Sequence, residues 1–180
     1  GPGPQNSACM NRLTLRAILN CPEDVFRDIA ISSTSTLEDL HSAIASAYAL
    51  EAGQMASFYT TDDQWNQGEE IPLMAMDPQG LGAMSDHALG SILGQPGQRL
   101  IFVYDFLAMW TFMVEYVRAD EAPEAEPSVV LSYGDRPKEA PDPEFAGEGG
   151  MSQAFDDEDE EEDEYGFDEE DLEGYSSDEW

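Results

Sequence analysis

The sequence predicts an α+β fold: a single domain with an antiparallel or mixed β-sheet and two helices, followed by a disordered acidic tail. Three observations predict it. Several stretches alternate apolar and polar residues, two segments repeat apolar residues at helical spacing, and the final segment contains acids without bases. The expected element order is β-β-α-β-α-β-β, with a further short strand at 71–76. We describe this arrangement as β-grasp-like, with the helices on one face of the sheet.

The first two strands are predicted at residues 11–19 and 25–32. Both stretches alternate, as half-buried strands do. The segment 20–24 between them (Asn-Cys-Pro-Glu-Asp) is typical of a turn, so the two strands should form a hairpin. The side chains expected on its buried face are Leu13, Leu15, Ala17, Leu19, Val25, Ile29 and Ile31.

A helix should follow this hairpin. Ser35 with Glu38 fits a capping box, and Thr36 with Asp39 fits nearly as well. Gly53 is a natural C-terminal stop. Apolar residues then recur at helical spacing on one stripe, which should pack on the sheet; they are Leu37, Leu40, Ile44, Ala47 and Tyr48.

The remaining elements are shorter. A strand is predicted at 56–61 and a loop at 62–68. A short helix should begin after Ser85 or Asp86 and end at Gly94. Residues 98–105 form an unbroken apolar run typical of a central strand. Residues 109–117 alternate again after a turn at 105–108, and we expect Tyr104 and Trp110 to fill the core.

Composition divides the chain into four segments. Residues 1–9 resemble a cloning remnant, so the natural chain is expected to start at Met10. Residues 10–119 have the size of one domain. Residues 120–154 hold five of the eleven prolines and are predicted to be a linker-like extension. Residues 155–180 hold sixteen carboxylates and no Lys or Arg, which predicts a disordered tail.

The net charge of −32 excludes some classes of partner. Seven bases are too few for a surface that binds nucleic acid or an anionic membrane. We therefore expect a basic protein, or a basic patch of a protein complex, as partner. No membrane-spanning run or signal peptide is predicted, and Cys21 would be alone in a chain starting at Met10, so a cytoplasmic location is expected.

Catalytic, cofactor and metal sites are not expected. His41 could act as a base with Asp105 or Asp62, but a histidine at the edge of the core is the more common case. Two histidines and a single native cysteine cannot supply the four ligands of a zinc site. An enzyme with a cleft near His41, Asp105 and Trp65 is kept as an alternative hypothesis.

An ordered set of motifs resembles a known family. The set comprises the opening hairpin, the helix at 35–41, Phe58-Tyr59, the segment 86–93, and the strand 102–106 followed by Trp110. Together they resemble the plasmid pRiA4b ORF-3-like family over residues 12–147. The loop at 62–71 is similar to a version found in Bacteroidetes, whose members tend to end in acidic tails.

The resemblance implies an α+β fold and a bacterial protein, and it carries no agreed activity. Two departures from the family pattern matter. The turn that usually holds Gly and Asp has Leu107 and Ala108 here. The closing segment at 141–144 lacks the family's cysteines, so the resemblance implies no metal there.

Aromatic residues in the tail favour docking over a purely solubilising role. Acidic-hydrophobic alternation suits a disordered segment that binds a basic, partly apolar groove. An exposed Trp in an acidic loop is a further candidate contact. The predicted partner-binding residues are Trp65, Tyr165, Phe167, Leu172, Tyr175 and Trp180.

Three other roles for the tail remain open from sequence. It could mimic nucleic acid on a DNA- or RNA-binding protein, with carboxylates in place of phosphates. It could simply keep the protein soluble. It could also cover bases of its own domain, for which the candidates are Arg12, Arg16, Arg27 and Arg99.

Overall fold

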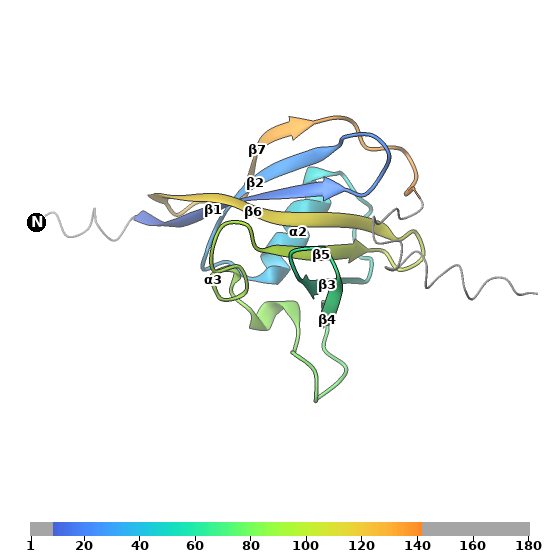
Figure 1. The fold of residues 1–180 in the computed structure, drawn as a ribbon, viewed down its shortest axis with the longest axis horizontal. Helices are drawn as coiled ribbons and strands as arrows, with labels where there is room; N and C mark the ends of the chain where they lie inside the picture. Colours follow the sequence, from blue (N-terminus) through green and yellow to red (C-terminus); the bar gives the residue numbers. More distant parts are fainter. Residues whose placement is uncertain (1–8, 142–180) are drawn as a thin grey trace, which may run out of the picture. The chain divides into compact units, whose positions relative to one another are not determined.

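The computed structural model describes residues 9–141, which form one α+β domain around a sheet (Figure 1). Within these residues the sheet has seven strands in the order β4-β3-β5-β6-β1-β2-β7, and every neighbouring pair is antiparallel. The elements are β1 (Cys9–Leu19), β2 (Phe26–Ser32), α2 (Leu37–Ala47), β3 (Ala56–Thr61), β4 (Gln67–Pro72), the 3₁₀ turn η1 (Met84–Asp86), α3 (Leu89–Ile92), β5 (Arg99–Tyr104), β6 (Trp110–Pro123) and β7 (Ser128–Tyr133).

The predicted hairpin and the main helix are confirmed. β1 pairs with β2 in the expected hairpin. Of the two capping boxes considered, the helix uses the second: Asp39 N donates to Thr36 Oγ1 at 3.2 Å, and Thr36 N donates to Asp39 Oδ2 at 2.9 Å. α2 ends at Ala47, before the predicted stop at Gly53.

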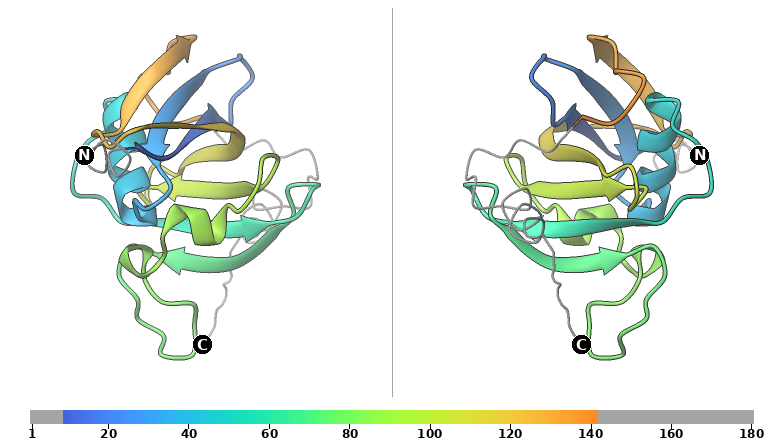
Figure 2. Two further views of the ribbon diagram at one scale, coloured as in Figure 1. Left: turned by 90° about the vertical axis from the view of Figure 1, so that its left-hand side faces the viewer. Right: turned by 90° about the vertical axis from the view of Figure 1, so that its right-hand side faces the viewer.

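The hydrophobic core lies between α2 and one face of the sheet (Figure 2). Leu37, Leu40 and Ile44 of α2 are fully buried, as the helical stripe predicts. The aromatic rings of Tyr48 and Phe112 pack with centroids 4.8 Å apart. The Tyr48 hydroxyl donates to the Ala17 carbonyl at 2.7 Å, which satisfies its only polar group inside the core.

The structure extends the sheet beyond the domain boundary expected at residue 119. β6 continues to Pro123. It contains a β-bulge at Val117, which has no paired residue in β1. β7 pairs with β2 inside the range 120–154, which sequence composition assigned to a linker. The prolines flank β7 rather than interrupting it, so the Pro content of the range did not prevent a strand.

Arg136 fastens the segment after β7 to the end of α2. Its Nε donates to the Tyr48 carbonyl at 2.6 Å, and Nη2 donates to the Ala49 carbonyl at 3.0 Å. Its guanidinium also lies 5.0 Å from the Trp110 ring centroid. The last carbonyls of a helix lack partners within the helix and carry partial negative charge, so a cation there stabilises the helix end.

Smaller boundary differences occur elsewhere. β4 occupies Gln67–Pro72, where the sequence predicted a loop to residue 68 and a strand at 71–76. The short helix α3 begins at Leu89 without a side-chain cap, rather than after Ser85 or Asp86. In the described part of the chain, no helix is long and apolar enough to cross a membrane.

Candidate functional site

His41 is packed among aromatic rings. Its ring centroid lies 5.8 Å from that of Phe102 and 5.6 Å from that of Tyr104. Both ring nitrogens are buried without a hydrogen-bond partner among the described residues. Burial lowers the pKa of His41, and the nearby charge of Glu38 opposes this only partly. A neutral imidazole among rings is the boundary histidine that the sequence favoured.

The acid–base pair of the enzyme alternative is not formed. The Asp105 carboxylate accepts hydrogen bonds from the backbone N–H groups of Leu107 and Ala108 in its own turn. Asp62 accepts from the backbone of Gln64 and from the side chain and backbone of Asn66. The Asn66 side chain is the largest cause of the lowered pKa of Asp62. Neither carboxylate hydrogen-bonds to His41, so these groups act as turn-forming residues.

Trp65 is half-buried rather than fully exposed. Its backbone has φ 65°, a left-handed conformation that is uncommon for a bulky residue. The ring lies over the guanidinium of Arg99, with the Arg99 Cζ atom 4.7 Å from the centroid. Arg99 also donates to the Asp63 carbonyl. The loop therefore holds Trp65 on a cation of its own domain, and only part of the ring is free for a partner.

Tyr104 and Trp110 are both buried, as predicted. The Tyr104 hydroxyl donates to the Glu51 carbonyl at 2.5 Å. Beside these rings lies an open hollow of about 310 Å³, whose lining includes Asp105, Arg136 and Lys138. Arg136 already donates to four backbone carbonyls, so few of its N–H groups are left for a ligand.

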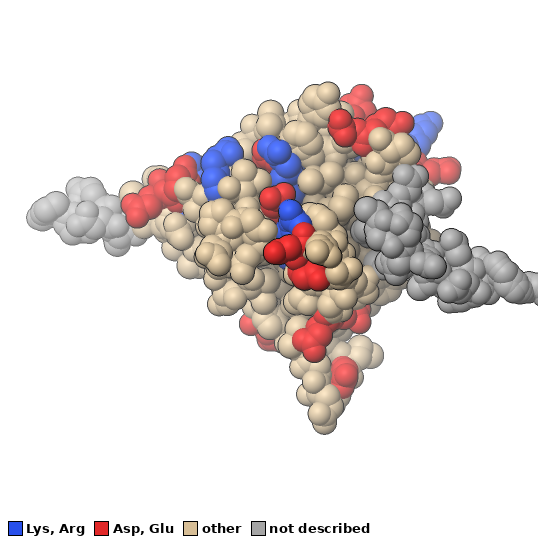
Figure 3. All heavy atoms as spheres, in the orientation of Figure 1, with Lys and Arg blue, Asp and Glu red and all other residues tan. Residues whose placement is uncertain are grey.

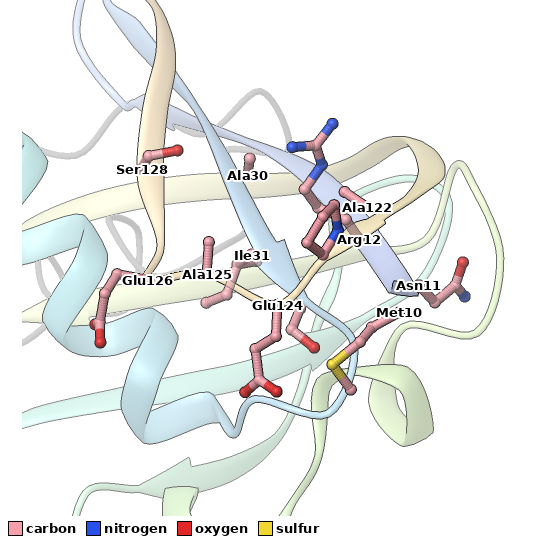
Figure 4. Close-up of a pocket in the computed structure, with 12 residues that line it drawn as sticks. Met10, Asn11, Arg12, Ala30, Ile31, Ala122, Glu124, Ala125, Glu126 and Ser128 are labelled. Carbon is pink, nitrogen blue, oxygen red and sulfur yellow. The ribbon is translucent and has the colours of Figure 1, made fainter. Parts of the chain in front are cut away.

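A second hollow lies where the N-terminal end of β1 meets the connection between β6 and β7 (Figure 4). Met10, Arg12, Ala122 and Glu124 are among its lining residues. Its volume is about 30 Å³, which is room for about one water molecule. This hollow is too small for a substrate.

A larger groove was missed by sequence reasoning. It has a volume of about 560 Å³ and runs between α2 and β7. Its existence depends on β7, which the sequence did not identify. The available signal was Val129-Val130-Leu131 between Pro127 and Gly134, a β-branched run bounded by turn residues.

The positive charges of the chain lie within the described residues, and most of them are already engaged. Arg12 and Arg16 each form two hydrogen bonds with one carboxylate, those of Asp120 and Asp28. These bonds raise the pKa of both arginines, and the bond from Arg12 lowers the pKa of Asp120. Figure 3 shows Lys and Arg residues (blue) lying beside Asp and Glu residues (red) on the face of the molecule that is turned to the viewer.

Three further arginines bind backbone carbonyls and aromatic rings. Arg27 donates to the carbonyls of Phe26, Tyr133 and Gly134, and its guanidinium lies over the Tyr48 ring. Arg99 and Arg136 are engaged as described above. Five of the seven bases therefore have partners inside the domain.

The predicted tail contacts lie outside the described residues; they are Tyr165, Phe167, Leu172, Tyr175 and Trp180. Within residues 9–141, no group of three His, Cys, Asp or Glu side chains is arranged to hold a metal ion. Cys9 and Cys21 are not joined by a disulfide.

Fold and composition define the class: an α+β domain on an antiparallel sheet, followed in sequence by an acid-rich segment. The model of the plasmid pRiA4b ORF-3-like protein family matches residues 12–175, so the chain belongs to this family. The predicted resemblance is confirmed, and the match continues past residue 147, where the resemblance was expected to end.

A solved structure shares the fold. It is that of a protein of unknown function, MM3350, from Methanosarcina mazei Go1, with a TM-score of 0.55 and 18% sequence identity. The similarity covers 68% of this chain and 69% of that chain. A comparison with curated proteins found no match. The structural likeness therefore supports the fold alone.

Proposed function

We propose that this protein is a non-enzymatic interaction protein whose acidic, aromatic tail docks on a basic surface of another protein. The anchors would be Tyr165, Phe167, Tyr175 and Trp180, with Leu172 and Trp65 as further contacts. Charge would steer the encounter, and the rings would provide most of the affinity.

The engagement of the domain's own bases carries this proposal. Residues 142–180 contain nineteen acids and no base, whereas all seven bases lie before them. To neutralise the tail within the same chain, Arg16 would have to give up a two-point bond to the buried carboxylate of Asp28. Arg27 and Arg136 would have to leave carbonyls unpaired. A separate basic partner offers the tail charge without these losses.

The first experiment compares the full-length chain with a variant lacking residues 155–180 in pull-downs from lysate. We expect basic proteins to be captured by the full-length chain and lost with the tail. An unchanged set of captured proteins would contradict the proposal. Amide NMR spectra of the two chains, compared over residues 9–141, test the alternative in which the tail covers its own domain.

A pair of matched variants separates aromatic docking from nucleic-acid mimicry. The first replaces Tyr165, Phe167, Tyr175 and Trp180 with Ser and keeps every carboxylate. The second replaces the acids at 156–164 with Asn and Gln and keeps every ring. Docking predicts that the first variant loses capture at physiological salt. Mimicry predicts that it retains capture, that only the second loses it, and that added DNA competes.

Three finer features of the protein are part of the proposal. The hairpin, helix and following strands support a β-grasp-like description, and the loop at 62–71 supports a Bacteroidetes-type, bacterial member of the family. A cytoplasmic location is proposed from the low cysteine content of the chain, two in 180 residues.

A further inference from the structure

β7 is an edge strand whose outer side has no strand partner among the described residues. It pairs with β2 and lies at the end of the strand order. Four of its side chains are 43–56% exposed; they are Val129, Val130, Leu131 and Tyr133. Residues 127–134 contain no charge, in a chain with a net charge of −32. An uncharged apolar edge can template pairing with another strand.

The opposite edge of the sheet is built differently. β4 carries Glu69 and Glu70 within the strand, and it ends in Pro72. Charged side chains and proline are the usual features that keep edge strands from pairing with other chains. One edge is therefore closed to pairing and the other is open.

The groove between α2 and β7 adds a place for side chains next to this open edge. Its lining combines apolar atoms of Ala43, Ala47 and Val129 with two carboxylates, Asp39 and Glu126. No basic side chain lines it. Glu124 and Glu126 precede β7, so the first end of the strand is acidic, whereas Asp135 after the strand is followed by Arg136.

We propose that β7 is a docking edge for an extended, cationic segment of a partner protein. The segment adds to the sheet beside β7 through backbone hydrogen bonds. Alternate apolar side chains of the segment contact the exposed valines and the groove. Lys or Arg residues at its ends face Asp39 and Glu126. This site is separate from the tail, and it gives a second contact to a basic partner.

The charges argue against the two other available occupants. The chain's own tail is rich in Asp and Glu, which are poor strand formers, and it would meet the carboxylates of the groove. A second copy would bring a net charge of −32 to a chain of the same charge, which opposes pairing through β7. A cationic strand meets opposite charge at Asp39, Glu124 and Glu126.

The test uses the full-length chain and two synthetic peptides of equal charge. The first is Lys-Arg-Val-Thr-Val-Thr-Val-Arg-Lys with blocked ends, and the second has Pro in place of both Thr. Both peptides can bind the acidic tail by charge, but prolines remove strand hydrogen bonds. We expect the first peptide alone to shift the backbone amide NMR signals of 128–133, and to bind at least about tenfold more tightly than the Pro peptide.

Two variants then locate the binding. Leu131→Lys places a cation on the open edge and should weaken binding of the first peptide at least about tenfold, while Glu126→Gln should weaken it about threefold. Glu69→Lys makes a similar change on β4 and should leave the difference between the two peptides intact. Leu131 and Glu126 are exposed, so unchanged circular dichroism should confirm that these variants fold.

Three outcomes would overturn the proposal. The two peptides could bind equally, the shifts could fall outside β7 and the groove, or Leu131→Lys could bind as well as the wild type. A dimer in solution that Leu131→Lys dissociates would instead assign the edge to a second copy. Absence of tail docking with these results intact would reject only the proposed function, since β7 lies within residues 9–141 and is present in the chain that lacks residues 155–180.

Discussion

The two faces of the sheet bury very different side chains. The face toward α2 is filled by rings and aliphatic groups, among them Phe58, Phe102 and Phe112. Alternation along the strands places buried polar groups on the other face, among them Asp28 and Ser57. Asp28 is bound to Arg16 and Ser57 donates to Glu70. The first face depends on packing, whereas the second combines cross-strand polar partners with buried apolar side chains such as Ile101 and Val103.

The largest expected effect belongs to the packed face. Phe112→Ala should lower the free energy of unfolding by about 3–5 kcal/mol, because it removes a fully buried ring that contacts Tyr48 and Phe102. Urea denaturation followed by circular dichroism measures the loss. Leu107→Ala, at a side chain that is 96% exposed, is the control and should change stability by less than about 0.5 kcal/mol.

The polar face should come next. Asp28→Ala leaves the Arg16 guanidinium without its carboxylate at a half-buried site, which should cost about 2–3 kcal/mol. The Arg12–Asp120 pair has the same two-point geometry with side chains that are 43% and 56% exposed. Asp120→Ala should therefore leave the denaturation midpoint unchanged. Equal losses at the two pairs would show that burial does not distinguish them.

Arg136 tests whether the region after the sheet belongs to the same cooperative unit. Arg136→Ala removes hydrogen bonds to the Tyr48 and Ala49 carbonyls and should cost about 1–3 kcal/mol. Arg136→Lys should recover only part of it, because an ammonium cannot reproduce the planar fork. Hydrogen exchange should also accelerate at the end of α2. Full stability in the Ala variant would mean that the fold does not use this contact.

His41 should give the smallest effect, and one that depends on pH. Burial lowers its pKa in the folded state, so below about pH 6.5 the unfolded chain binds a proton that the folded chain refuses. Protonation of His41 therefore has no effect on the free energy of unfolding at high pH. It lowers this free energy as the pH falls through the pKa that His41 has in the unfolded chain. His41→Leu should lose less stability than the wild type between pH 8 and pH 5. Parallel curves for the two proteins would exclude this effect.

Sequence patterns predicted the packed face well because its signal is local. The spacing of Leu37, Leu40 and Ile44 predicts the buried stripe of α2. The alternation along β1 predicts which of its side chains face the core. The sequence also contained the capping box at Thr36, together with a competing one at Ser35 that the structure does not use. Each of these features is decided within a few residues.

The other features required contacts between distant parts of the chain. In the sequence, Asp28 looks like an ordinary exposed acid. Only the pairing of β1 with β2 shows that it lies opposite Arg16. The end of the domain was misplaced because Arg136 reaches back to Tyr48, which no periodicity reveals. Trp65 was proposed as a contact residue if exposed, and the sequence did not indicate that Arg99, 34 positions further along the chain, covers one side of its ring.

The attachment of Arg136 to α2 sets a practical limit on how the protein can be shortened. A fragment ending near residue 119 would lack the end of β6 and all of β7. It would also lack Arg136, which in the described part of the chain is the only arginine bound to the C-terminal end of α2. A fragment intended for crystallisation or for measuring the body without its polyanion should therefore run at least through residue 141.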